Sequence, residues 1–98
     1  MTKAEIISSI SDKIGVEKVE VHAVLEAFMK EVKNSVSNNE NVYLRGFGSF
    51  VVKPRAKKTG RNITKNTTII IPAHNIPAFK PAKVFVDQVK TKVVLEQN

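Results

Sequence analysis

The side chains that could do chemistry in this chain gather in one basic stretch, RAKKTGRNITKN, at residues 55–66. Five of its twelve side chains are cationic and none is acidic. Because the stretch contains no carboxylate, its lysines and arginines cannot form salt bridges within it. Their counter-charges must come from another part of the protein or from a partner. The chemistry that it predicts is electrostatic binding of a polyanion, either nucleic acid or an anionic membrane.

The net charge of +7 comes entirely from the middle of the chain. Residues 1–40 hold five lysines and seven acidic residues, and the last twelve residues are neutral overall. Between Asn41 and Val86 there is no acidic residue. The cations of that segment are Arg45, Lys53, Arg55, Lys57, Lys58, Arg61, Lys65, Lys80 and Lys83. This segregation favours a polyanionic partner over a surface that is charged merely to stay in solution.

Catalytic or metal chemistry has no comparable support. His22 and His74 stand in different predicted elements without a second ligand at metal-binding spacing, and the chain has no cysteine. Asp87 is the only carboxylate between Asn41 and Leu95, which leaves little for acid–base catalysis. GFGSF at 46–50 lacks the third glycine and the Gly-Lys-Ser/Thr ending of phosphate loops. We therefore expect no enzyme activity, no catalytic residue, no metal, no cofactor and no small-molecule substrate.

Length and composition predict one folded domain, residues 1–98, with a thin core. The chain is 42% hydrophobic and 26% charged, which is typical of globular proteins. A chain of this size that also extends a basic arm has little left to bury, which favours an oligomer. The opening MTKAEIISSISDK is polar and no apolar run approaches a membrane span, so we expect a cytoplasmic protein. A membrane partner is the weaker prediction because no helix has a basic amphipathic face.

Two helices are predicted before the basic segment. Thr2 and Glu5 have the spacing of a capping box, isoleucines recur at helical spacing, and Gly15 offers a stop. A second apolar stripe predicts a long helix from about Glu17 to Ser37. The turn formers SNNEN at 37–41 end it, which defines a helical base at about residues 1–40.

After residue 41 the apolar period changes to two, which predicts strands. Residues 42–45 and SFVVK flank the turn GFG as a hairpin, and TTIIIP at 67–72 reads as a return strand after Asn66. His74 is predicted in a loop at the base of the arm. One side of a continuous outgoing strand carries four cations, Lys53, Arg55, Lys57 and Arg61. Lys58 alone breaks the alternation. Such a limb reaches about 30 Å, about one turn of duplex DNA.

The predicted fold class is α+β. It has a helical base of two N-terminal helices, a three-stranded antiparallel sheet with a long protruding β-ribbon arm at about 41–79, and a short C-terminal helix at about 80–98. Pro81 is predicted as the first residue of that last helix, where Phe85, Val89 and Val93 share a face. A solvated loop is the alternative interpretation of the basic arm.

Four segments in this order resemble the HU / integration host factor family of bacterial histone-like DNA-binding proteins: GFGSF at 46–50, RAKKTGRN at 55–62, IP at 71–72 and PAFKPAK at 77–83. The resemblance runs from Lys3 to about Lys90. It implies an intertwined dimer, of identical or different chains, whose two arms follow the minor groove of double-stranded DNA. It also implies an architectural protein of the nucleoid that binds with little sequence preference, bends DNA and helps to compact a bacterial chromosome.

The resemblance extends the set of candidate site residues. On the arm, DNA contacts are expected at Lys53, Arg55, Lys57, Lys58, Arg61, Asn62, Ile63 and Lys65. On the sheet and its flanks they are expected at Lys3, Arg45, Lys80 and Lys83. The expected centre of the dimer is Phe47, Phe50 and Phe79. An ordinary intrachain core for the phenylalanines and a role in solubility for the flanking lysines are the alternatives.

Two departures from the family pattern matter, and a further feature is a likeness to one branch of the family. The family usually has a proline at the arm tip that wedges between base pairs, and this chain has Ile63, which is apolar but lacks the fixed backbone angle of proline. Asn66 replaces the usual glycine of the tip turn, a mild change. RGFGSF, with Arg45, is closer to the beta subunit of integration host factor. Arg45 would then contact either the minor groove or a phosphate, and a site-specific DNA-bending factor is the alternative function.

Overall fold

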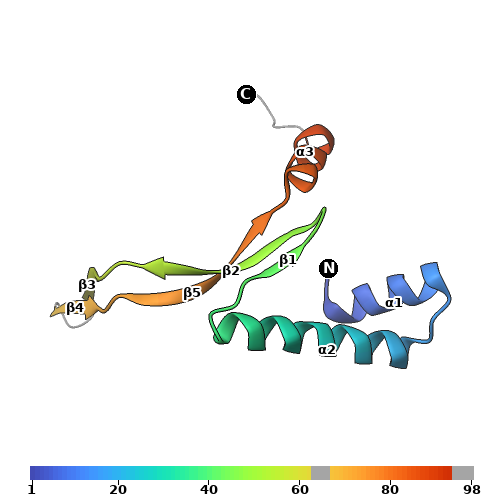
Figure 1. Cartoon of the computed structure of the whole chain (residues 1–98), viewed down its shortest axis with the longest axis horizontal. Coiled ribbons are helices and arrows are strands. Elements are labelled where there is room, and N and C mark those ends of the chain that lie inside the picture. Colours follow the sequence, from blue (N-terminus) through green and yellow to red (C-terminus); the bar gives the residue numbers. More distant parts are fainter. Residues whose placement is uncertain (63–66, 94–98) are drawn as a thin grey trace.

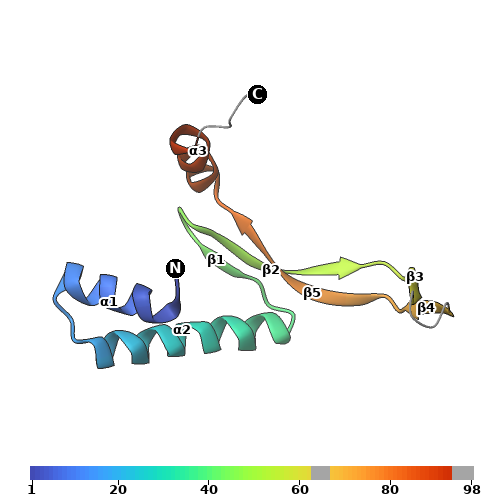
Figure 2. The same ribbon diagram turned by 180° about the vertical axis from the view of Figure 1, so that it is seen from behind.

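A helical hairpin, a small sheet, a projecting ribbon and a last helix follow one another in the computed structural model, which describes residues 1–62 and 67–93 (Figure 1). The elements are α1 (Lys3–Ile14), α2 (Lys18–Ser37), β1 (Val42–Leu44), β2 (Gly48–Arg55), β3 (Lys58–Asn62), β4 (Thr67–Ile71), β5 (His74–Pro81) and α3 (Lys83–Lys92). Seen from both sides, the ribbon extends away from α1 and α2, and α3 stands at the far end of the sheet (Figures 1 and 2). The predicted α+β class is confirmed.

Both ends of α1 form as predicted. The backbone N–H of Glu5 donates to Thr2 Oγ1 at 3.2 Å, which satisfies one of the free donors of the first turn. At the other end Gly15 has φ +72°, a left-handed conformation that glycine adopts without steric cost, and its N–H donates to the carbonyl oxygen of Ser11. These local bonds explain why α1 spans this stretch of the chain.

The end of α2 is also local in origin. The N–H of Asn38 donates to the carbonyl oxygens of Asn34 and Ser35, which closes the last turn. Asn39 then takes φ +62°, which asparagine tolerates better than most residues. The chain therefore leaves the helix where SNNEN predicted it would.

Antiparallel pairing places β2 at the centre of a sheet with the order β1–β2–β5. A Cβ atom on Gly48 would lie 2.5 Å from Cζ of Phe79 and 2.6 Å from the carbonyl oxygen of Lys80. Both distances are shorter than van der Waals contact, so only glycine fits there. The GFG segment thus does more than turn the chain, because Gly48 lets the Phe79 ring and the Lys80 carbonyl of the neighbouring strand β5 approach β2 closely.

The arm consists of two ribbon segments in one register. Arg55 pairs with His74 and Lys58 pairs with Ile71, so neither strand gains a residue between the two pairs. The ladder is nevertheless interrupted at residues 56–57, and Lys57 lies in the interruption. In this register Lys57 faces Pro72, which has no N–H to donate to a ladder. The prediction of one continuous outgoing strand was wrong in this respect, and so was that of His74 in a loop, since His74 begins β5.

The predicted start of α3 was wrong by two residues. Pro81 is the last residue of β5, where it pairs with Gly48, and the helix begins at Lys83. Ala82 stays extended (φ −68°, ψ 153°), and its N–H donates to the carbonyl oxygen of Phe47 at 2.9 Å. That hydrogen bond keeps Pro81 and Ala82 beside the sheet, whereas the sequence pattern alone predicted a helix from Pro81. Proline is tolerated at 81 because β5 is an edge strand.

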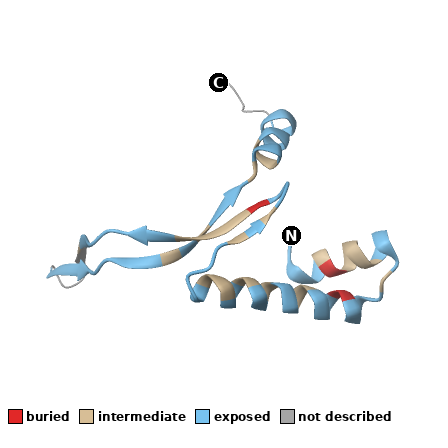
Figure 3. Ribbon diagram, viewed as in Figure 1, coloured by how far each residue is buried: buried red, intermediate tan, exposed pale blue. Residues whose placement is uncertain are grey.

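The core of a single chain is small (Figure 3). Within the described residues the buried hydrophobic side chains are Ile7 and Val21, which are 7% and 6% exposed, one on each helix of the hairpin. The Cα radius of gyration is 19.1 Å, against about 13 Å for a compact chain of this length. The accessible surface is 8648 Å², against about 5,600 Å² for a compact monomer of this mass. One chain alone therefore leaves most of its apolar side chains in contact with water.

Candidate nucleic-acid interface

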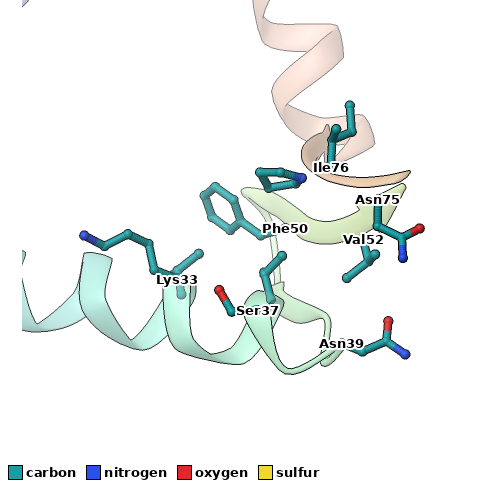
Figure 4. A pocket seen from close by; sticks show the side chains of 10 residues that line it. Lys33, Ser37, Asn39, Phe50, Val52, Asn75 and Ile76 are labelled. Carbon is teal, nitrogen blue, oxygen red and sulfur yellow. The ribbon is translucent and has the colours of Figure 1, made fainter. Parts of the chain in front are cut away.

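The two faces of the sheet differ in chemistry. Side chains of directly paired residues share a face. Phe50 pairs with Phe79 and Val52 with Pro77, so one face is apolar. This face lies toward the C-terminal turns of α2, and a hollow of about 580 Å³ remains between them, as Figure 4 shows for Phe50 and Val52 near Ser37. The apolar face is therefore incompletely covered by its own chain.

The opposite face carries a cation in three of its four rows, and we name it the cationic face. Its rows, in order toward the arm, are Tyr43–Ser49–Lys80, Val51–Ala78, Lys53–Ile76 and Arg55–His74. Successive rows are about 7 Å apart, because side chains return to the same face every second residue. Lys80, Lys53 and Arg55 are all exposed. Arg45, in the turn after β1, adds an exposed cation beside the first row.

The end of this face near the turn is hollowed. A shallow groove of about 740 Å³ is lined by residues of β1, the turn, β2 and the end of β5, among them Tyr43, Arg45, Ser49 and Lys80. It thus brings together two of the predicted cations, Arg45 and Lys80, which are far apart in sequence. A concave surface with two guanidinium or ammonium groups at its rim is suited to a phosphate-bearing backbone.

The cations of the arm continue from the cationic face without a nearby carboxylate. Lys57 and Lys58 are exposed, and β3 places Arg61 opposite Thr68 and Asn62 opposite Thr67. The ion pairs of the described residues all involve Glu26, on α2. The predicted contacts Ile63 and Lys65 lie outside the described residues. The described part of the arm thus offers its positive charge to an external partner.

Among the predicted cations whose side chains the structure describes, Lys3 differs because it has a partner within the chain. Its ammonium group forms an ion pair with Glu26, and Nε2 of His22 lies 3.6 Å from the same carboxylate oxygen. The hydrogen bond from Lys3, followed by the charge of Lys3, lowers the pKa of Glu26. Lys3 therefore links α1 to α2 in the helical base. Lys83, by contrast, is exposed at the first residue of α3.

The three phenylalanines expected at the centre of a dimer gather within one chain around the ring of Phe79. The ring centroid of Phe79 is 5.1 Å from that of Phe47 and 5.0 Å from that of Phe50. A fourth ring, Phe85 of α3, stacks on Phe47 at 5.6 Å. Phe47 and Phe79 remain 46% and 37% exposed. The cluster is an apolar surface that its own chain leaves half open, and the helical spacing of Phe85 and Val89 was the available signal for its fourth member.

Sequence reasoning missed three members of the cationic face: Tyr43, Ser49 and His74. The alternation of residues 42–45 does place Tyr43 and Arg45 on one side of a strand. What it could not reveal is the register that sets Tyr43 in one row with Lys80, because the two residues are joined only through Ser49 of the intervening strand. His74 was missed because its segment was not predicted as a strand.

Other kinds of site have no counterpart in the described parts of the chain. Across residues 1–62 and 67–93, no three side chains of the metal-binding types come together as a metal site. Nor is any helix of these residues both long enough and apolar enough to cross a bilayer.

Comparison with known proteins gives one consistent picture. Residues 1–90 match the family described as bacterial DNA-binding protein. The SPbeta prophage-derived DNA-binding protein HU 2 of Bacillus subtilis is 40% identical over 92 residues, which are 94% of this chain and 100% of that protein. The HU protein of Xylella fastidiosa is 38% identical over 92% of this chain and 96% of its own. The structure of Anabaena HU cocrystallised with DNA superposes with a TM-score of 0.88 at 37% identity, covering 92% of this chain and 98% of the other.

Proposed function

This chain belongs to the HU family of bacterial DNA-binding proteins, and on that premise we propose that it binds double-stranded DNA with little sequence preference and bends it. The observation that carries the proposal is the exposed cationic face, which continues onto the arm without a carboxylate between Asn41 and Val86. In the cell such a protein contributes to chromosome compaction and is associated with the nucleoid in the cytoplasm. Its family is one of DNA-binding proteins rather than of enzymes.

Electrostatics explain both the affinity and the low selectivity. Lysine and arginine replace the counterions that duplex DNA holds, and the released ions drive binding. Contacts to phosphates carry no direct information about base sequence. A two-stranded ribbon is narrow enough to follow a groove, and the narrow minor groove concentrates negative potential. Lys53, Arg55, Lys57 and Lys58 would thus follow the DNA backbone from the sheet onto the arm.

We propose further that the active unit is a homodimer. The exposed rings of Phe47 and Phe79, the partly buried Phe50 beside them and the hollow next to α2 give each chain an apolar surface to bury against a second copy. A two-fold dimer also supplies two arms, which can hold DNA on both sides of a bend. A heterodimer with a related chain is the alternative, and the mass of the complex purified from its own cell would distinguish the two.

Bending would require an apolar side chain that inserts between base pairs, in addition to the cations that bind the phosphates. Minor-groove architectural proteins, HU among them, insert apolar side chains between base steps and kink the duplex toward the major groove. In the sequence, Ile63 stands where the family usually has its wedging proline, and it lies outside the described residues. Its apolar side chain is large enough to separate two base pairs, and its backbone is less constrained than that of proline.

A site-specific bender of the integration host factor type is the less favoured function, since the relatives described above carry the name HU. Arg45 is the residue on which that alternative depends. Selection of binding sites from random DNA, repeated with Arg45→Ala, would reveal a sequence preference if one existed.

The proposal is tested by removing the arm cations. Replacing Arg55, Lys57, Lys58 and Arg61 together by alanine should weaken binding to unrelated linear duplexes by a similar factor, about a hundredfold or more at moderate salt, because most of the phosphate contacts of each arm are lost. Fluorescence anisotropy with labelled duplexes measures this.

A matched control is available in the helical base. Alanine at Lys13, Lys18, Lys30 and Lys33 removes the same charge from α1 and α2 and should change the affinity much less. Equal losses in the two quadruple variants would mean that net charge, and not the arm, carries binding.

A further inference from the structure

Tyr43 is more exposed than an aromatic residue that stabilises a hydrophobic core would be. It is 72% exposed and belongs to the first row of the cationic face, in line with Ser49 and Lys80. It also lines the shallow groove together with Arg45. An exposed tyrosine buries little of its ring and so contributes little to the stability of the chain on its own.

Asn41 holds this tyrosine at the edge of the sheet. The backbone N–H of Val52 donates to Asn41 Oδ1 at 3.2 Å, so the Asn41 side chain replaces a strand carbonyl just before β1 begins. The Asn41 amide nitrogen then donates to the hydroxyl oxygen of Tyr43 at 3.3 Å. One side chain thus ties the tyrosine hydroxyl to the backbone of the central strand.

The direction of that hydrogen bond leaves the tyrosine with a donor. A phenol oxygen can accept and donate, and here it accepts from Asn41. Among the described residues, no hydrogen bond is found in which the Tyr43 hydroxyl is the donor. Arg45 and Lys80 line the same groove, and the strands of this face contain no carboxylate. An O–H donor in a groove that two cations also line is a complement for an anionic oxygen.

We propose that Tyr43 is a further DNA-contacting residue, with Asn41 as its positioning residue, and that the groove beside it seats one segment of the DNA backbone. The Tyr43 hydroxyl would donate to a phosphate oxygen whose charge Arg45 and Lys80 neutralise, and the ring would lie against the adjoining deoxyribose. This inference rests on the proposed function and deepens it. It gives the sheet a neutral contact beside the cations of the arm.

A fluorine label tests the contact directly, because the chain has one tyrosine and no tryptophan. Protein made with 3-fluorotyrosine has a single labelled position, Tyr43. Its fluorine resonance should shift when the full-length dimer is saturated with a linear duplex. An unchanged resonance at saturation would overturn the proposal while leaving DNA binding itself in place.

The variant Tyr43→Phe supplies a second readout. It retains the ring and loses the hydroxyl, so the affinity for a linear duplex should fall about three- to tenfold, the range of a net hydrogen bond. The slope of log K against log salt should stay the same, because no cation is removed. Tyr43→Ala should weaken binding further. Wild-type affinity in both variants would refute the proposal.

Two controls separate contact from structure. Asn41→Ala should alter the fluorine resonance of the free protein and cause a smaller loss of affinity than Tyr43→Ala, as expected of a residue that acts through its neighbour. Val19→Thr, at an exposed position on α2, should change neither. If Tyr43→Phe instead lowered the mass of the dimer in sedimentation at unchanged DNA affinity per dimer, the groove would be a protein contact, and the proposal would be wrong.

Discussion

At the scale of single residues, three positions have a local effect on the backbone pairing of the strands: Gly48, Asn41 and Pro72. Gly48 lets the ring of Phe79 and the carbonyl of Lys80 approach β2. Asn41 replaces a missing strand carbonyl. Pro72 stands opposite Lys57, where the ladder of the arm is interrupted. None of the three is a DNA contact in this account, yet each positions residues that are.

The Gly48→Ala variant should be less stable by about 1–3 kcal/mol, the usual cost of forcing an extra methyl group into a packed site. The clash with the backbone oxygen of Lys80 is the reason, because a backbone atom cannot rotate away as a side chain can. Urea unfolding at fixed protein concentration measures the change.

Gly60→Ala is the control, since the nearest atom to an added Cβ there is 4.0 Å away. Its stability should be unchanged or slightly higher. Similar stabilities of the Gly48 and Gly60 variants would contradict the close packing of β5 on β2.

At the scale of elements, local signals determine the ends of α1 and α2, and long-range pairing determines the strands and the start of α3. Thr2, Gly15 and Asn39 act within a few residues of themselves, and the ends of α1 and α2 were predictable for that reason. Pro81 was not, because ending an edge strand and starting a helix are both compatible with proline. The choice depends on Gly48 and on the hydrogen bond from Ala82 to Phe47, which are distant in sequence.

Part of the candidate site could likewise be predicted from the sequence, and part depends on long-range pairing. Cations concentrated between Asn41 and Val86 predict a polyanion partner from composition alone. That Lys80, Lys53 and Arg55 form one track, and that Tyr43 belongs to it, follows only from the pairing register of three strands. The ion pair that occupies Lys3 was equally beyond sequence reasoning, because its partner Glu26 lies 23 residues away on another helix.

The arm should bend DNA through its tip as well as bind it. Ile63→Ala should reduce the bend of a duplex more than it reduces affinity, because the wedge is lost while the cations remain. Energy transfer between dyes on the two DNA ends, measured at saturation, reports the bend. Ile63→Pro, which restores the residue usual in the family, should retain it. The same energy transfer for Ile63→Ala and wild type would remove Ile63 from the bending mechanism.

At the scale of the whole molecule, one chain alone buries few of its hydrophobic side chains. Its surface exceeds that of a compact monomer, and its aromatic cluster is half open. Two such chains would cover both the phenylalanines and the hollow beside α2, and would oppose two arms across one duplex. Dimer formation and DNA binding are thus linked in this account: the same sheet has an apolar face for the partner chain and a cationic face for DNA.

Unfolding should therefore depend on protein concentration. The thermal midpoint should rise as the concentration is increased, since association stabilises the folded chains by mass action. Phe79→Ala should lower the free energy of unfolding by about 3 kcal/mol or more, the cost of truncating a phenylalanine in a core, because the second chain would bury its ring. A midpoint independent of concentration, together with the sedimentation mass of a single chain, would contradict the dimer.

The salt dependence of DNA affinity tests the central claim most directly. If the arms and cationic faces of a dimer engage about eight phosphates, log K for a linear duplex should fall against log salt with a slope of about −7, at about −0.9 per contact. Titrations by anisotropy at several salt concentrations give this slope. A value near −7 is the result that we predict, and a slope of about −2 would mean that the arms do not lie along the DNA.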